Sequence, residues 1–168
     1  GNDGELHGGS FDFGIIGSAY SADAFGDYVI AADNAELPVS GTSRSVSLWF
    51  KSGSDKKYQN ADHIVNWGSA TPQNAFGVMV YAHNNIHAYT HVHDLDSEVP
   101  VKTAWQHAVV TYEQNSQQLS VFVDGSLRAS STYVLDTIGS DIFFAARPDV
   151  LTSGGDSSYQ GLIDEVRI

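Results

Sequence analysis

The stretch AVVTYEQNSQQLSVFVDG, residues 108–125, determines the fold class that this sequence predicts. Residues 108–112 and 119–123 are rich in Val and aromatic side chains, which fit a pleated, half-buried strand, and polar residues 113–117 separate them. Asp124-Gly125 is the strongest short hairpin signal, since both central positions of such a turn need a positive φ. The stretch therefore predicts two antiparallel strands, and residues 126–130 follow as a third.

The same period of two continues on both sides of this stretch. Val46, Leu48 and Phe50 alternate with more polar neighbours, as in a strand with one buried face. Residues 78–82 and 86–92 read as a hairpin around 83–85, and two further strands are expected at 141–145 and 162–168, whereas no window has a convincing helical period. Many short strands without helices predict an all-β fold, an antiparallel sandwich or barrel.

Length and composition limit the function. The chain has 168 residues, a formal charge of -12 and no cysteine, and 42 % of it is hydrophobic. We expect a single domain over 1–168 with a real core and neither disulfides nor thiolate metal sites. The acidic surface repels phosphate backbones and anionic lipid heads, and no apolar run of membrane-spanning length occurs, so nucleic acid binding and membrane insertion are not expected.

Three segments carry a family resemblance: SADAFGDYV at 21–29, WQHAVVTY at 105–112 with VFVDG at 121–125, and YQGLIDEVRI at 159–168. Together they resemble the laminin-G-like, concanavalin A-like jelly-roll lectin domains, and the last segment is the most specific. The resemblance implies an antiparallel two-sheet β-sandwich whose first and last strands lie side by side.

The resemblance also implies a function, because members of this family mostly bind glycans, cell-surface ligands or other proteins. They occur as modules of bacterial extracellular enzymes and adhesins. The sequence stops on a strand residue, Ile168, so we expect a module of a larger extracellular or cell-surface protein. A fold alone does not specify the ligand.

Many family members carry a structural calcium ion, which the resemblance would place at Asp23 and Asp164. Two carboxylates with backbone carbonyls would suit the six to eight oxygen ligands of Ca²⁺. Ala22 and Ala24 depart from the family pattern beside Asp23. The alternative is that Asp164 caps a turn or pairs with Arg167.

Polar rings occupy alternate positions of one predicted strand, namely His87, Tyr89, His91 and His93. Alternate strand residues share a face, and the intervening residues of 86–92 are expected in the core, so this histidine row should face solvent near Asp94. Three interpretations stay open. The rings could stack on sugars with Tyr89 as the platform, His91 and His93 could chelate a transition metal, or the row could be a solvated sheet surface.

Two more residues are candidate ligand contacts. Trp67 precedes Gly68 at a predicted loop, where it could be an exposed sugar platform or a cover for the sandwich edge. Arg147 begins a predicted loop, where it could bind a carboxylated sugar or form a salt bridge. Trp49, Trp105 and His107 lie in family strand positions and are expected to be structural.

No catalytic motif is present, since an E-x-D-x-E run, a G-x-S-x-G elbow and an H-E-x-x-H helix are all missing. Asp164 and Glu165 are consecutive, so on a strand they would point to opposite faces. We therefore expect a non-catalytic, lectin-like module that binds a glycan or cell-surface polysaccharide beside neighbouring domains. The alternatives are a protein–protein adhesion or assembly module and, less favoured, a glycan-cleaving enzyme.

Overall fold

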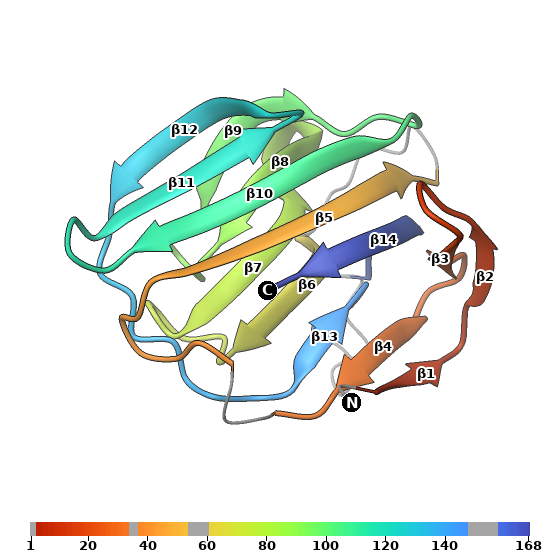
Figure 1. The fold of residues 1–168 in the computed structure, drawn as a ribbon, viewed down its shortest axis with the longest axis horizontal. Helices are drawn as coiled ribbons and strands as arrows, with labels where there is room; N and C mark the ends of the chain where they lie inside the picture. The colour runs from red at the N-terminus through yellow and green to blue at the C-terminus, as the bar shows by residue number, and fades with distance from the viewer. Residues whose placement is uncertain (1–2, 34–36, 54–60, 148–157) are drawn as a thin grey trace.

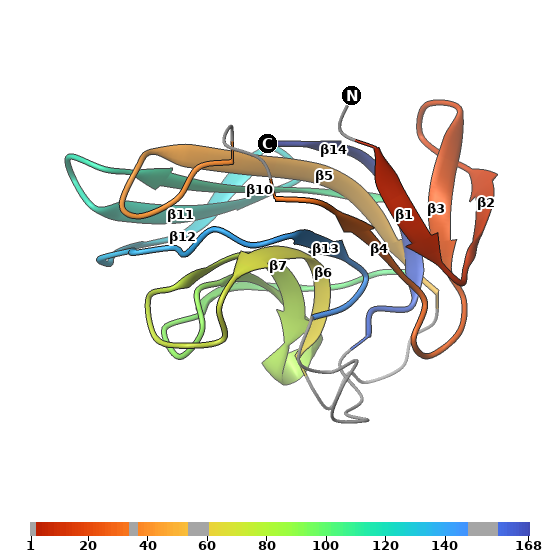
Figure 2. The same ribbon diagram turned by 90° about the horizontal axis from the view of Figure 1, so that it is seen from below.

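Two antiparallel sheets of seven strands pack face to face in the computed structural model of this chain (Figures 1 and 2). The structure describes residues 3–33, 37–53, 61–147 and 158–168. Helical structure in these residues is limited to one short 3-10 turn, η1 (Ala82–Asn84). The predicted all-β jelly-roll sandwich is confirmed, and no described helix is long and apolar enough to cross a membrane.

Sheet A has the strand order β1 (Gly4–His7), β4 (Tyr28–Ala31), β13 (Ile142–Phe144), β6 (Asp62–Gly68), β7 (Ala75–Tyr81), β8 (Asn85–Tyr89) and β9 (Leu95–Pro100). Sheet B has the order β12 (Ser126–Thr132), β11 (Gln118–Val123), β10 (Gln106–Glu113), β5 (Arg44–Ser52), β14 (Gly161–Arg167), β3 (Ser18–Ala22) and β2 (Ser10–Phe13). Figure 2 shows the two sheets edge-on as two layers.

The predicted hairpins form as expected in sheet B. Strand β10 pairs with β11, and β11 pairs with β12 across a turn in which Asp124 has φ 51° and Gly125 has φ 75°. Strand β5 alternates between buried and partly exposed residues, with Val46, Leu48 and Phe50 in the core. The period of two in the sequence therefore corresponds to one face of sheet B packed against sheet A.

The last strand does not lie beside the first. Strand β14 pairs with β3 and β5, whereas β1 belongs to sheet A and pairs with β4. The chain leaves sheet A after β1, forms the β2–β3 hairpin at the edge of sheet B, and returns to sheet A as β4 (Figure 1). The family expectation therefore holds only for a neighbouring N-terminal strand, β3.

Candidate functional site

A row of residues on the outer face of sheet A forms the floor of the candidate site. In this row Phe143 of β13 pairs with Asn66 of β6, Asn66 pairs with Gly77 of β7, and Gly77 pairs with Tyr89 of β8. The alternate residues of these strands, such as Trp67, Phe76, Val78 and Ala88, belong to the core. Cross-strand partners share a face of the sheet, so Phe143, Asn66 and Tyr89 lie on the side away from sheet B.

Gly77 is required at the centre of this row. A Cβ atom there would lie 2.1 Å from the carbonyl oxygen of Val65 and 2.8 Å from the Cα of Asn66, both backbone atoms. Because no side chain separates Asn66 from Tyr89, the sheet surface is hollowed between them. Any larger residue would push β6 and β7 apart.

A cavity of about 450 Å³ lies over the β13 and β6 part of this row, and its described lining residues are Asn66, Gly68, Ser69, Ala70, Tyr89, Ser140, Asp141, Phe143 and Arg147. The volume falls in the range of small-molecule sites, roughly 300–1,000 Å³. Tyr89 and Phe143, which are largely buried, line the cavity beside amide, hydroxyl, carboxylate and guanidinium groups. This combination of apolar rings and polar groups suits a sugar, whose rings present C–H faces and hydroxyl edges.

Hydrogen bonds hold the polar groups of the cavity in place. The side-chain amide of Asn66 donates to the carbonyl of Ala146 at 2.7 Å, which orients its Oδ1 as a remaining acceptor. Ser140 accepts a hydrogen bond from the Gly68 amide at 2.7 Å, so it joins the end of β6 to the segment before β13. One carboxylate oxygen of Asp141 accepts from the Asp33 amide at 2.8 Å. Such fixed groups reduce the ordering cost of binding a ligand.

Tyr89 packs against His63 of β6, which lies on the same outer face of sheet A. The two rings meet edge to face with centroids 4.4 Å apart and planes at 85°. His63 is fully buried, and within the described part of the chain neither ring nitrogen has a hydrogen-bond partner. Burial, with smaller contributions from Arg147 and His91, lowers the pKa of His63 well below its ordinary value. The ring is therefore neutral, and it fixes the orientation of Tyr89.

Only one member of the predicted histidine row lies in the cavity. Strand β8 ends at Tyr89, and His91 (φ 57°) and Val92 (φ 80°) belong to the following turn. The period of two therefore breaks after Tyr89, and Val92, expected in the core, is 64 % exposed. The prediction of a four-residue solvent-facing row is wrong.

His87 and Tyr89 do share the outer face of sheet A, but they are 4 % and 3 % exposed. His87 lies 3.6 Å from the carboxylate of Asp96 and in edge contact with Tyr81, outside the cavity lining. The hydroxyl of Tyr89 lies 3.5 Å from Nδ1 of His91. The outer face at β8 is thus a packed surface, not a solvated one.

Asp94 and His93 stabilise the turn between β8 and β9. The carboxylate of Asp94 accepts a hydrogen bond from the Thr90 amide at 2.9 Å, and His93 packs on the ring of Tyr133 with centroids 4.9 Å apart. Burial raises the pKa of Asp94, although the Thr90 N–H opposes this shift. Neither residue lines the cavity, so the structure gives both a role in the turn.

Of the two further predicted ligand contacts, Trp67 lies in the core and Arg147 lies at the cavity. Trp67 is 1 % exposed, packs against Phe76, and donates its indole N–H to the carbonyl of Pro38 at 3.1 Å. The interpretation as an exposed platform is therefore wrong, because the residue faces the core. Arg147 is partly exposed and lines the cavity with Tyr89, so the structure brings these two predicted residues together. The loop predicted after Arg147 lies outside the described residues.

The expected calcium pair does not converge. Gly161 pairs with Ala22 and Ile163 with Tyr20, which places Asp23 and Asp164 four positions apart along the paired strands, about 13 Å. Asp164 accepts three backbone N–H bonds, from Ile15, Ile16 and Glu165 at 2.7, 3.1 and 2.8 Å. Donors point at the carboxylate where a cation would have to bind, so Asp164 fits the alternative of a turn cap. No described group of three or more His, Asp or Glu side chains is arranged for a metal, and calcium binding stays a prediction without assigned residues.

Two residues of the cavity floor, Asn66 and Phe143, have no counterpart among the predicted contacts. Phe143 lies within the apolar run Ile142-Phe143-Phe144, whose face cannot be assigned because the alternation is lost. Asn66 interrupts the apolar pattern between Val65 and Trp67. A polar residue inside a buried strand is the one signal that could have identified it.

Comparisons with known proteins agree with this architecture. The family model described as the Concanavalin A-like lectin/glucanases superfamily matches residues 23–168. A search of curated proteins gave no match.

Similar folds occur among solved structures. Domain 4 of AbnA, a GH43 extracellular arabinanase from Geobacillus stearothermophilus in complex with arabinotriose, has a TM-score of 0.70 and 18 % identity over 98 % of this chain and 80 % of its own. The CBM40 of the Ruminococcus gnavus IT-sialidase, bound to α2,3 sialyllactose, has a TM-score of 0.62 and 12 % identity over 88 % and 86 % of the two chains. The endo-β-1,4-glucuronan lyase of Trichoderma reesei has a TM-score of 0.61 and 13 % identity over 98 % of this chain and 86 % of its own. Identities this low show the shared fold alone.

Proposed function

We propose a non-catalytic carbohydrate-binding function for this chain, which belongs to the Concanavalin A-like lectin/glucanases superfamily. The observation that carries the proposal is the cavity on sheet A, where Phe143, Asn66 and Tyr89 form one row. Two of the similar structures hold sugars by their own descriptions: the arabinanase domain is in complex with arabinotriose, and the CBM40 is bound to sialyllactose. These relatives support glycan binding as the class of activity.

The proposed mechanism uses aromatic contact and fixed polar groups. The Arg147 guanidinium, Asn66 Oδ1 and the second carboxylate oxygen of Asp141 bind the hydroxyls of a sugar ring. Tyr89 and Phe143 are 3 % and 7 % exposed, so they contact its C–H face only with the small part of each ring that lines the cavity. Arg147 can also take a sugar carboxylate, because guanidinium groups bind carboxylates in bidentate geometry. The small size of the cavity and the burial of its two rings support low to moderate affinity.

The charged residues that line the cavity favour glycan binding over glycan cleavage. Asp141 is the one carboxylate among its described lining residues, whereas two-carboxylate glycoside hydrolysis needs an acid and a base or nucleophile at a defined separation. We place the module in an extracellular protein, as in the extracellular arabinanase whose domain it resembles in fold. We also propose that the module binds a structural calcium ion, without assigning the residues that hold it.

Isothermal titration calorimetry tests the proposal with the wild-type chain and the Asn66→Leu variant, which removes the central polar group of the floor. Binding of an oligosaccharide by the wild type, weakened at least about tenfold in the variant (~1.4 kcal/mol), supports the assignment. Equal affinities would place the site elsewhere on the molecule.

A second candidate, a protein adhesion or assembly role, is favoured by the N-terminal strands. Five large apolar side chains between residues 6 and 16 are 41–87 % exposed, namely Leu6, Phe11, Phe13, Ile15 and Ile16. An apolar crevice of about 320 Å³ beside them is lined in part by Leu6, Phe11 and Tyr20. Several large exposed apolar side chains in one short segment favour a protein contact there.

A further inference from the structure

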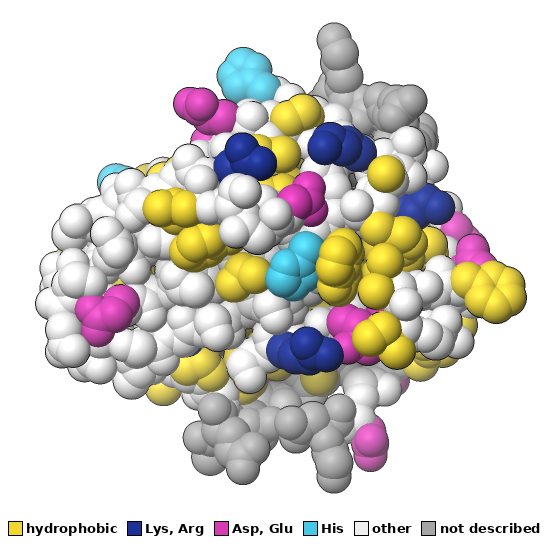
Figure 3. All heavy atoms as spheres, turned by 45° about the horizontal axis from the view of Figure 1, so that its top comes forward, with side chains coloured by type: hydrophobic (Ala, Val, Ile, Leu, Met, Phe, Trp, Pro, Cys, Tyr) yellow, Lys and Arg dark blue, Asp and Glu magenta, His cyan; other side chains and the backbone are white. Residues whose placement is uncertain are grey.

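An aromatic pair lies on the outer face of sheet B, opposite to the sheet A cavity. Trp49 of β5 pairs with His107 of β10 across the sheet, and their rings are 5.0 Å apart at 39°. Their strand neighbours Leu48, Phe50 and Ala108 are in the core, so Trp49 and His107 face solvent. Figure 3 shows hydrophobic side chains on both sides of a histidine on this face. The partly exposed Trp49 is therefore available to a ligand.

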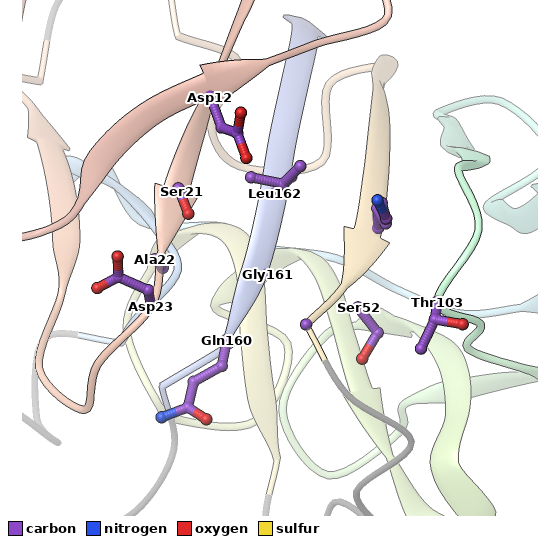
Figure 4. A pocket seen from close by; sticks show the side chains of 11 residues that line it. Asp12, Ser21, Ala22, Asp23, Ser52, Thr103, Gln160, Gly161 and Leu162 are labelled. Atoms are coloured by element: carbon purple, nitrogen blue, oxygen red, sulfur yellow. The ribbon is translucent and has the colours of Figure 1, made fainter.

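A polar trough of about 580 Å³ lies on the same face, farther along β5. Figure 4 shows Asp12, Ser21 and Asp23 on one side of β14, and Ser52 and Thr103 on the other, with Gly161 between them. A Cβ at Gly161 would lie 2.3 Å from the Lys51 carbonyl oxygen and 3.0 Å from the Gly53 amide. No larger residue fits at Gly161, whose backbone lines the trough.

Lys51 and Leu162 connect the trough to the aromatic pair. Lys51 lies two residues beyond Trp49 on the same strand face and pairs with Leu162, and both residues line the trough. Two residues along a strand span about 7 Å, so the Trp49 ring and the trough are adjacent. Within the described residues, neither the Lys51 ammonium nor the Asp23 carboxylate forms an ion pair. Both groups are thus open to an incoming ligand.

We propose that Trp49 and this trough form a second glycan-binding surface, which takes an uncharged polysaccharide chain running along β5. The inference rests on the proposed carbohydrate-binding function. The Trp49 ring would contact the face of one sugar unit, while Ser21, Lys51 and Thr103 bind the hydroxyls of the next units. The carboxylates of Asp12 and Asp23, on a chain of formal charge -12, exclude acidic polysaccharides.

Two sites on opposite faces make the module bivalent. One module could then hold two polysaccharide chains, or two segments of one chain, and its overall affinity for a polymer would exceed that of either site alone. An oligosaccharide too short to reach both faces would show two independent sites.

The test is an NMR titration of the ¹⁵N-labelled chain with three uncharged probes, arabinotriose, cellotetraose and triacetylchitotriose. Expected are shifts of the Trp49 indole N–H and of the Gly161 and Leu162 amides with at least one probe. Trp49→Ala should weaken this binding about tenfold, whereas Phe122→Ala should not. Phe122 is a matched control because it is partly exposed on the same face, two strands from β5.

The outcomes separate the two proposals. Shifts confined to the sheet A cavity, or Trp49-site binding that is unchanged in Trp49→Ala, would overturn the second surface and leave the proposed function standing. Binding at Trp49 that persists in Phe143→Ala would support an independent second surface. Probes that shift neither face would overturn both.

Discussion

The rings of His63 and Tyr89 meet edge to face with centroids 4.4 Å apart, and no described residue forms a hydrogen bond with either ring nitrogen of His63. A fully buried polar ring with no partner costs stability, on the order of 1–3 kcal/mol. The contribution of His63 to the site is its packing against the Tyr89 ring. Replacement by an apolar ring of similar shape should keep this packing and remove the cost.

We therefore expect His63→Phe to raise the free energy of unfolding at pH 7 by about 1 kcal/mol. Urea unfolding of the two proteins measures the difference. Glycan affinity should stay within about threefold, because Tyr89 keeps its support. A loss of more than 1 kcal/mol would contradict the expectation, and it would mean either that the His63 nitrogens have polar partners or that the site does not accept the larger phenyl ring.

The lowered pKa of His63 also predicts a pH dependence of stability. An unfolded histidine titrates near pH 6.5, so below that pH the unfolded state binds a proton that the folded state does not. The contribution of His63 is fully present above about pH 6.5 and is lost as the pH falls toward its folded pKa, by up to ~1.4 kcal/mol per pH unit. Melting temperatures between pH 7.5 and 5 should show a smaller decrease in His63→Phe than in wild type. The exposed His83, substituted in His83→Asn, is the control for loss of a histidine outside the core.

Substitutions at Tyr89 and His91 distinguish a sugar site in the cavity from one at the turn after β8. Tyr89→Ala removes a lining ring and should weaken oligosaccharide binding at least about tenfold, whereas His91→Ala should change it less than about threefold. Calorimetric titrations of both variants, after far-UV circular dichroism has verified their folding, give the comparison. Equal losses in the two variants would instead support a histidine-based site.

Asp164 should stabilise the β2–β3 hairpin without a metal. Its carboxylate takes the amides of Ile15 and Ile16, and a Cβ at Gly14 would lie 2.4 Å from its Oδ2. Asp164→Ala should cost about 2–3 kcal/mol by leaving partly buried donors without an acceptor. The cost should be the same in chelator and in calcium. A stabilisation by calcium that is present in wild type and absent in Asp164→Ala would restore the metal interpretation.

Phe13 tests the alternative role in protein contact. It is 87 % exposed on the edge strand β2, so Phe13→Ser should change stability by less than about 0.5 kcal/mol. Its affinity for oligosaccharide should equal that of wild type. Sedimentation of the module at high concentration, or with a candidate partner, shows whether the substitution removes an association.

The fold could be predicted from sequence because it depends on local signals. The alternation through Val46, Leu48 and Phe50 and the Asp124-Gly125 turn specify strands and a register without any information from distant segments. The neighbour of β14 was harder to predict, because β1 and β3 are both N-terminal and only long-range pairing chooses between them.

The site was predictable only in part, since it depends on which face of each strand is covered. Tyr89 and Arg147 were identified by type and position, and the structure places both at the cavity. The prediction of a histidine row was wrong because β8 ends at Tyr89 and because His91 and Val92, both with positive φ, form the turn that follows. The interpretation of Trp67 as an exposed platform was wrong because Trp67 lies on the inward face of β6, in the core beside Phe76. Phe143 sits in an apolar run without alternation, so only the tertiary structure assigns its face.

The most direct measurement is a glycan-array screen of the wild-type chain and Tyr89→Ala side by side, in calcium and again in chelator. The account predicts reproducible binding of one glycan class by the wild type and loss of that binding in the variant. A blank array for the folded wild-type protein, or the same binding by both proteins, would contradict a carbohydrate site at the sheet A cavity.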